Sequence, residues 1–364
     1  MNKDHYMRMI YEHLNDTKTY KRTDETCDKK VRLNIEKLVK KYENTLTKQE
    51  SAYLTNYVFK TSNFYGIPKV HKSKIINDAI EQQKSEYIET LEPNDLSLRP
   101  IVAGPICPTR NLSNLIDILL KPFIIHVKSY IKDSVDFLNK CKRQSSDSNL
   151  LVTFDVKSLY TSIPHEFGLE AIKFWLEKHP QSLHKRFSKD FILESSKFIL
   201  ENNTCTFNDE YYTQISGTAM GTIFAPTYAT LTMGYLEIKL YETCEIKFNT
   251  TVRNFIYDNW SRFLDDCEII LNREMMTPET LLQILNSLNP AIQFTMETSS
   301  LEIPFLDILI QQKEGKICMD LYRKPTDTQR CLDFNSCHPT TCKTNIPFTM
   351  ARRICTIVEK NFST

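Results

Sequence analysis

The chain has 364 residues, of which 41% are hydrophobic and 25% are charged. This composition excludes a disordered chain, and the length favours two or three packed subdomains over a single core. The formal net charge of +1 gives no overall sign of a nucleic-acid partner, although a neutral molecule can still carry a basic groove.

The cysteines and the apolar stretches indicate the compartment. The eleven cysteines are scattered without a C-x-x-C pair, and a chain of this size needs no disulfide staples. The start of the chain is polar and charged, unlike a secretory signal. The most apolar stretch, Leu115 to Val127, is too short to span a bilayer and is interrupted by Asp117 and Lys121. We therefore expect an intracellular protein without a membrane partner.

The first 145 residues contain signals for helices and for two strands. Residues 1–62 are predicted to form a helical N-terminal extension, in which Thr47 and Glu50 have the spacing of a capping box. The next predicted elements, in order, are a strand and turn over Asn63–Lys72, an exposed helix or inserted loop over residues 73–97, a strand over Leu98–Ala103 and a helix over Thr109–Val127.

The rest of the chain alternates helical and strand patterns. A buried strand is predicted over Leu150–Asp155, and it ends in a carboxylate. The following predictions are a helix after Pro164, a hairpin turn at Phe207–Tyr211, a helix within Gly217–Leu240, a tight hairpin over Trp260–Leu271, and strands over Ile292–Glu297, Ile303–Gln311 and Ile317–Tyr322. This pattern predicts an α+β fold with antiparallel strands and helices over one sheet face.

Two acidic segments have the character of a metal site. Asp155 ends a predicted strand, and Asp265-Asp266 lie at a predicted hairpin tip. Taken separately, each has an ordinary alternative, because aspartate is a common turn former and helix cap. Together they supply the carboxylates from different elements that two divalent cations require.

Between the two acidic segments lies a glycine-containing stretch from Gln214 to Pro226. It uses two of the seven glycines, Gly217 and Gly221. Glycine allows the backbone to approach a substrate closely, but it also suits a tightly packed junction between a loop and a helix. Taken alone, the stretch favours the tightly packed junction.

These segments resemble a known family. Phe154-Asp-Val-Lys-Ser-Leu-Tyr-Thr-Ser-Ile-Pro164, Gln214 to Pro226 and Arg262-Phe-Leu-Asp-Asp266 are similar, in that order, to motifs A, B and C of reverse transcriptases. Other segments resemble motifs specific to Penelope-like retroelements: Phe64-Tyr-Gly-Ile-Pro-Lys-Val-His-Lys72, Leu98-Arg-Pro-Ile-Val102, Ile303-Pro-Phe-Leu-Asp-Ile-Leu309, Tyr322-Arg-Lys-Pro-Thr-Asp-Thr328 and Ser336-Cys-His-Pro339.

The resemblance implies a role for each site residue. Asp155 and Asp265 would hold two Mg²⁺ ions, for which Mn²⁺ is an alternative, with Asp266 as a further ligand or electrostatic support. The remaining roles are as follows: Lys69 and Arg99 would contact the triphosphate, Tyr160 would exclude ribonucleotides, Gln214 and Gly217 would lie against the incoming nucleotide or template base, and Phe263 and Lys72 would contact nucleic acid.

The resemblance also implies an architecture and an activity. The expected fold is a right-hand polymerase, with fingers over residues 63–145, a palm with a central antiparallel sheet over residues 146–312 and a partial thumb over residues 313–364. The expected activity is RNA-directed DNA polymerisation, with an RNA template, a DNA primer and deoxynucleoside triphosphates as partners. A nuclear location follows from the retroelement resemblance, whereas the oligomeric state is not predicted.

Two other functions remain open from the sequence. A decayed or co-opted remnant would keep the fold and bind nucleic acid without catalysis. A carboxylate-dependent nuclease would need a base to activate water, and His165 is the histidine near an acidic segment. No segment resembles the GIY-YIG endonuclease of full-length Penelope-like elements, so we expect a fragment or an endonuclease-lacking lineage. The general acid is not assigned.

Overall fold

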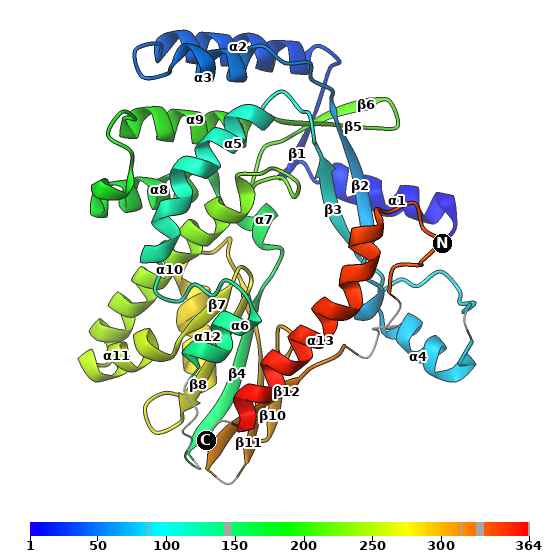
Figure 1. The fold of residues 1–364 in the computed structure, drawn as a ribbon, viewed down its shortest axis with the longest axis vertical. Coiled ribbons are helices and arrows are strands. Elements are labelled where there is room, and N and C mark those ends of the chain that lie inside the picture. The colour runs from blue at the N-terminus through cyan, green and yellow to red at the C-terminus, as the bar shows by residue number, and fades with distance from the viewer. Residues whose placement is uncertain (86, 142–145, 147, 314, 325–330, 363–364) are drawn as a thin grey trace. The chain divides into compact units, whose positions relative to one another are not determined.

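The computed structural model describes residues 1–85, 87–141, 146, 148–313, 315–324 and 331–362 (Figure 1). The chain divides into two compact units, each made from two stretches: unit 1 from residues 1–127 and 158–235, and unit 2 from residues 128–157 and 236–364. Helix α10, Ala225–Lys247, begins in unit 1 and ends in unit 2. Among the described residues, no helix has the length and apolar character needed to cross a membrane.

Unit 1 contains a five-stranded sheet with the order β1-β6-β5-β2-β3 (Figure 1). Its strands are β1 Tyr20–Thr23, β2 Ser62–Pro68, β3 Leu98–Ala103, β5 Asn203–Phe207 and β6 Glu210–Gln214. All neighbouring pairs are antiparallel except β2 and β5, which run parallel. The alternating burial along β2 places Phe64 in a core cluster with Tyr20 and Val102, so one face of the sheet is apolar.

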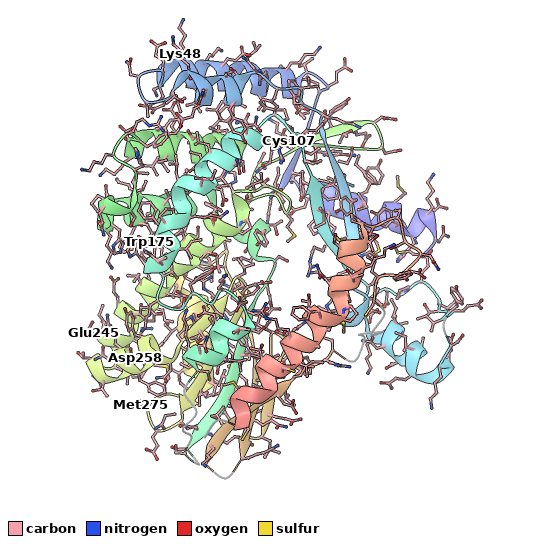
Figure 2. All side chains as sticks on the ribbon, viewed as in Figure 1. Lys48, Cys107, Trp175, Glu245, Asp258 and Met275 are labelled. Atoms are coloured by element: carbon pink, nitrogen blue, oxygen red, sulfur yellow. The ribbon has the colours of Figure 1, made fainter. Side chains whose placement is uncertain are left out.

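Helices form the rest of unit 1. They are α1 Lys3–Leu14, α2 Cys27–Lys41, α3 Lys48–Thr55, α4 Lys74–Gln83, α5 Arg110–Leu120, α7 Leu159–Ser162, α8 His165–Lys178 and α9 Lys189–Glu201, with short 3-10 turns η1 Val70–Lys72, η2 Lys121–His126 and η3 Pro180–Ser182. Trp175 of α8, labelled in Figure 2, is buried, and its indole nitrogen donates to the carbonyl of Leu231 on α10 at 2.8 Å. This contact joins the two helices inside the unit.

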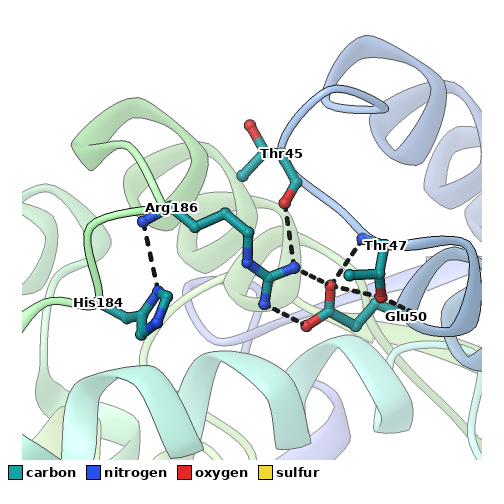
Figure 3. Close-up of polar contacts among 5 residues, drawn as sticks. All are labelled: Thr45, Thr47, Glu50, His184 and Arg186. Carbon is teal, nitrogen blue, oxygen red and sulfur yellow. Dashed lines mark hydrogen bonds and ion pairs between the residues drawn. The ribbon is translucent and has the colours of Figure 1, made fainter.

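The N-terminal extension contains the predicted helices and one strand that was not predicted. The capping box at Thr47 and Glu50 is present at the start of α3. Figure 3 shows that the Glu50 carboxylate also accepts hydrogen bonds from both terminal nitrogens of Arg186, one of them at 2.7 Å. Strand β1 pairs with β6, with Tyr20 opposite Gln214. The extension is therefore part of the unit 1 sheet as well as a set of helices.

Unit 2 contains a four-stranded antiparallel sheet with the order β7-β8-β4-β9. Its strands are β4 Asn149–Val156, β7 Ser261–Phe263, β8 Asp266–Asn272 and β9 Phe294–Ser299. Helices α11 Thr250–Asn259 and α12 Pro278–Leu288 pack against β8 and β9, and α6 Ser134–Lys140 precedes β4. The two central strands are the most buried of the sheet, with Leu151, Val152, Ile269 and Leu271 fully enclosed. The predicted α+β class with a central antiparallel sheet is confirmed.

A second sheet of unit 2 corrects one sequence prediction. The run Ile303–Gln311 was predicted as one strand, but it forms two: β10 Glu302–Phe305 and β11 Ile308–Lys313. They pair with each other and with β12 Lys316–Leu321. The prediction was wrong because the turn at Leu306 and Asp307 has no glycine, proline or asparagine, and Leu306 adopts a φ of 56°.

The turn residue Asp307 joins this second sheet to two helices. Its carboxylate accepts from the hydroxyl of Ser134 on α6 and pairs with Arg353 on α13, Thr340–Phe362. Its backbone carbonyl accepts from the amide of Tyr322 at 2.9 Å. The resemblance segment Ile303–Leu309 therefore has a structural role. Of the resemblance segment from Tyr322 onward, residues 325–328 lie outside the described residues.

Candidate active site

The central feature of unit 2 is a pair of aspartates on neighbouring strands. Asp155 of β4 lies directly opposite Asp266 of β8. Residues in such positions have Cβ atoms about 4.5–5.5 Å apart on the same face of the sheet. Asp265 precedes Asp266, and its carbonyl accepts from the amide of Val156 at 3.1 Å. The fold therefore gathers the backbone positions of all three predicted aspartates at one edge of the sheet.

The Asp265-Asp266 pair occupies a hairpin of minimal length. Phe263 pairs with Asp266, so only Leu264 and Asp265 form the turn between β7 and β8. Leu264 has a φ of 52°, a conformation that bulky side chains rarely adopt. The predicted hairpin is confirmed, with Asp265 in the turn and Asp266 as the first residue of β8. Phe263 is half-buried beside Asp266, at the position the resemblance gives to a primer contact.

The donor set at this edge fits a divalent cation. Within the described ranges, no group of three histidine, cysteine, aspartate or glutamate side chains is arranged to enclose a metal ion. Magnesium, however, binds through one or two carboxylates, and waters and substrate phosphates complete its coordination. Opposed carboxylates at Asp155 and Asp266, with Asp265 beside them, supply that number from two strands.

A fourth acid near the pair was not found from the sequence. Glu268 follows Asp266 by two positions, so it lies on the same face of β8, opposite Thr153. Its side chain is buried, and burial raises the pKa of Glu268 to about 8. Its Oε1 has no hydrogen-bond partner in the part of the chain that the structure describes. Glu268 is enclosed in the core, whereas the three aspartates are partly exposed.

A buried ion pair behind the hairpin was also missed. Arg262 of β7 is fully buried, and its Nε donates to Oε1 of Glu237 on α10 at 2.6 Å. Burial opposes the charged guanidinium, but the carboxylate of Glu237 raises the pKa of Arg262 overall. Glu237 also accepts from the indole of Trp260 at 3.0 Å and from the hydroxyl of Ser129 at 2.5 Å. Sequence periodicity could not reveal this network because its members lie on three separate segments of the chain.

The predicted triphosphate contacts lie in unit 1 on neighbouring strands. Lys69 follows β2 directly, and its amide donates to the carbonyl of Ser97 at 2.8 Å. Arg99 of β3 is opposite Ile67 of β2, and its side chain is exposed. Lys72 is exposed at the end of η1. The antiparallel pairing of β2 and β3 therefore brings Lys69 and Arg99 close together in the fold.

Tyr160 and Gly217 meet in unit 1, although 57 positions separate them in the sequence. The amide of Thr218 donates to the carbonyl of Tyr160 at 2.6 Å. Gly217 is buried with a φ of 69°, and a Cβ there would lie 2.3 Å from the same Tyr160 carbonyl. This close approach requires glycine. The tight packing that the sequence favoured for this stretch is present at Gly217, and it joins the segments of motifs A and B.

His165 strengthens the same junction. Its Nε2 lies 2.7 Å from the carbonyl of Gly217, so this nitrogen carries the proton and donates. Burial lowers the pKa of His165, which favours this neutral form. This hydrogen bond holds the imidazole ring against the Gly217 loop.

Gln214 supports the start of this loop. Its side chain is buried at the end of β6, and Nε2 donates to the carbonyl of Ser216 at 2.8 Å. Farther along, Gly221 has a φ of 128°, and a Cβ there would lie 2.3 Å from the carbonyl of Val102 on β3. The loop is thus fixed at both ends. A direct contact of Gln214 with the nucleotide stays a prediction.

Comparison with known proteins identifies the family. Residues 71–293, more than half of the chain, match the family described as reverse transcriptase (RNA-dependent DNA polymerase). The chain belongs to the reverse transcriptase family. The matched region of this reverse transcriptase contains the three aspartates, Tyr160 and the Gly217 loop. The family resemblance of the motifs is therefore confirmed, while the Penelope-like assignment stays a prediction.

Two solved structures with a fold similar to that of this chain are a telomerase and an RNA-dependent RNA polymerase. Telomerase from Candida albicans, in complex with a fragment of telomeric RNA, aligns with a TM-score of 0.56 and 9% identity, over 90% of this chain and 52% of that one. The RNA-dependent RNA polymerase of a human picorbirnavirus aligns with a TM-score of 0.50 and 10% identity, over 98% and 69%. The predicted right-hand polymerase fold is confirmed.

The other comparisons concern length and the C-terminal segment. Apo telomerase from Candida tropicalis, truncated from its C-terminal domain, aligns with a TM-score of 0.45 and 12% identity, over 68% of this chain and 60% of that one. The chain therefore spans about half to three-fifths of the first telomerase chains it matches. Residues 330–363 match the family described as animal helix-turn-helix domain, and α13 is the helix of the described part of that segment. No curated protein sequence matches the chain.

Proposed function

We propose that this reverse transcriptase is an RNA-directed DNA polymerase of a Penelope-like retroelement. The observation that carries the polymerase proposal is the register of β4 and β8, which sets Asp155 opposite Asp266 with Asp265 in the adjoining turn. The retroelement assignment rests on the fingers and tail segments, Phe64–Lys72, Leu98–Val102 and Ile303–Leu309. It leads us to propose a nuclear location as well.

The proposed reaction joins a deoxynucleoside triphosphate to a primer 3′ hydroxyl. Two divalent cations held by Asp155 and Asp265, with Asp266 beside them, would supply charge stabilisation for the attacking and leaving oxygens. Mg²⁺ is the proposed ion, and Mn²⁺ is the alternative. The short β7–β8 turn and the β4 strand hold the carboxylates in place, so little rearrangement is needed when substrate binds.

Residues of unit 1 are proposed to bind the substrate. Arg99 presents a planar guanidinium suited to phosphate oxygens, and Lys69 adds a compact positive charge on the adjoining strand. The ring of Tyr160 would occupy the space of a ribose 2′ hydroxyl and exclude ribonucleotides. Gly217, which contacts the Tyr160 backbone, fixes the position of that residue.

Nucleic acid is proposed as the macromolecular partner. The RNA template and DNA primer form an A-form hybrid, which proteins contact mainly through its backbone and 2′ hydroxyls. Phe263 and Lys72 are proposed contacts. Helix α13, within the segment similar to a helix-turn-helix domain, exposes Arg352 and carries Arg353 at its pair with Asp307. We propose that this helix lies along the duplex as part of the thumb.

Primer extension with matched templates tests this proposal. The purified protein is given a DNA primer on an RNA or a DNA template of the same sequence, with deoxynucleotides or ribonucleotides and Mg²⁺. We expect extension on RNA with deoxynucleotides and little with ribonucleotides. Extension only with ribonucleotides would identify an RNA polymerase instead. Hybrid binding without any extension would identify a catalytically inactive remnant.

A further inference from the structure

The backbone conformation of the Leu264–Asp265 turn is unfavourable, so other contacts in the structure must stabilise it. Leu264 has a φ of 52°, where a left-handed backbone is costly for a bulky side chain. The turn position that usually takes glycine here holds leucine. A second conformation of this turn would move Asp265, so the contacts that hold its peptide groups decide where the carboxylates lie.

Two hydrogen bonds hold the turn from two directions. The Nη1 of Arg262 donates to the carbonyl of Leu264 at 3.2 Å. The amide of Val156, on β4, donates to the carbonyl of Asp265 at 3.1 Å. The peptide that joins Leu264 to Asp265 is therefore restrained by the guanidinium, and the next peptide by the strand that carries Asp155.

The guanidinium is itself held by a buried carboxylate. Its Nε donates to Glu237, whose two oxygens also accept from Trp260 and Ser129. The backbone of Arg262 is fixed too, because its amide donates to the carbonyl of Ser129 at 2.8 Å and its carbonyl accepts from Ile131 at 2.9 Å. Arg262 faces the side of the sheet opposite to Asp266, since Phe263 is the residue that pairs with Asp266.

We propose that the buried Arg262–Glu237 pair is a positioning device that fixes the Leu264–Asp265 turn and thereby sets the geometry of the metal-binding aspartates. Arg262 acts through the Leu264 carbonyl and touches neither metal nor substrate. The proposal rests on the proposed function, because it assumes that the aspartates bind divalent cations. Outer residues that orient metal ligands commonly change metal affinity by about 10- to 100-fold when they are replaced.

A paired replacement separates positioning from stability. Removing one partner would leave a buried unpaired charge and destabilise the fold, whereas replacing both avoids this penalty. In the variant Arg262→Met with Glu237→Gln, the glutamine still offers an oxygen to Trp260, but the donor to Leu264 is lost. The matched control is Arg186→Met with Glu50→Gln, which removes an ion pair of unit 1 (Figure 3).

The measurement is Mn²⁺ binding in a complex that cannot react. Each protein is bound to an RNA–DNA hybrid with a dideoxy-terminated primer and the next deoxynucleotide, and unbound Mn²⁺ is followed by electron paramagnetic resonance. Unfolding in urea with EDTA is measured in parallel. We expect the Arg262–Glu237 variant to bind Mn²⁺ about 10- to 100-fold more weakly, and the control variant to bind it like the wild type.

Adding Leu264→Gly provides a rescue. Glycine adopts a left-handed backbone without the cost that leucine incurs. The triple variant should therefore regain most of the lost Mn²⁺ affinity, a recovery that a purely stabilising role of the pair would not produce. Wild-type Mn²⁺ affinity in the paired variant would overturn the positioning proposal alone. Equal Mn²⁺ binding by the wild type and Asp265→Ala would overturn the proposed metal site and, with it, the positioning proposal.

Discussion

Asp155 and Asp266 are direct cross-strand partners in the antiparallel pair of β4 and β8. Two carboxylates so placed repel each other unless a cation lies between or beside them. We expect Asp155→Asn to lower the rate of nucleotide incorporation by roughly a thousand-fold, which corresponds to about 4 kcal/mol of activation free energy. Single-nucleotide incorporation at saturating hybrid measures this. Asp258→Asn, on the exposed surface of α11 (Figure 2), is the control and should keep the wild-type rate.

Tyr160 should control the choice of sugar. Replacing it with alanine opens the space that a ribose 2′ hydroxyl would fill, so ribonucleotide incorporation should rise relative to deoxynucleotide incorporation by at least about ten-fold. Tyr160→Phe keeps the ring and should keep the discrimination. The ratio of kcat/KM for the two nucleotides on one template is the measurement. Unchanged discrimination in the alanine variant would show that Tyr160 does not contact the sugar of the incoming nucleotide.

Gly217 should tolerate no side chain. A Cβ would meet the Tyr160 carbonyl at 2.3 Å, and the φ of 69° adds strain. Gly217→Ala should lower the free energy of unfolding by on the order of 3 kcal/mol. Urea unfolding measures the change. Gly315→Ala, at a φ of 73° in the β11–β12 hairpin, is a control for the backbone strain alone. An equal loss in both variants would contradict the importance of the contact with Tyr160.

The stability contributed by the ion pair between Glu50 of α3 and Arg186 should depend on pH. The hydrogen bonds from Arg186, with smaller contributions from Thr47, lower the pKa of Glu50 from 4.5 to about 2 (Figure 3). A lowered carboxyl pKa adds stability above the unfolded-state value, and this stability is lost as the pH falls toward the folded-state value. The wild type should therefore exceed Glu50→Gln in stability at pH 7 and 5.

The same comparison repeated at pH 3 completes this test. At pH 3, a large part of the difference in free energy of unfolding between the wild type and Glu50→Gln should be lost. At this pH, Glu50 is mostly protonated in the unfolded chain but still mostly ionised in the folded chain. Urea unfolding of both proteins at pH 7, 5 and 3 gives the difference at each pH. A difference that stays constant across this range would mean that the ion pair does not contribute to stability.

The local sequence predicted the β7–β8 hairpin but not the similar hairpin between β10 and β11. The tripeptide Phe-Leu-Asp occurs at residues 263–265 and again at residues 305–307, and both copies form two-residue turns with leucine at φ 52° and 56°. The first was predicted because a second aspartate broke the apolar run. The second lies between apolar residues with neither a second aspartate nor a glycine, so periodicity indicated a continuous strand that included Pro304.

The candidate site was predictable to the extent that it depends on short motifs. Each aspartate lies near a strand end or in the turn beside one, and such positions can be predicted from local sequence. The Arg262–Glu237 pair could not be predicted, because it joins β7 to α10 and a single polar residue in an apolar pattern gives no indication of its partner. Glu268 was missed for the same reason, since its burial depends on the strands and helices packed around β8.

The most direct measurement of the central claim is primer extension by the wild type and by Asp265→Asn on the same primed RNA template, with binding of the hybrid measured alongside. Asparagine keeps the size of the side chain but removes the charge that a divalent cation requires. We expect DNA products for the wild type, none for Asp265→Asn, and equal hybrid binding for both. Extension by Asp265→Asn at a rate near that of the wild type would contradict a metal-dependent role of this carboxylate.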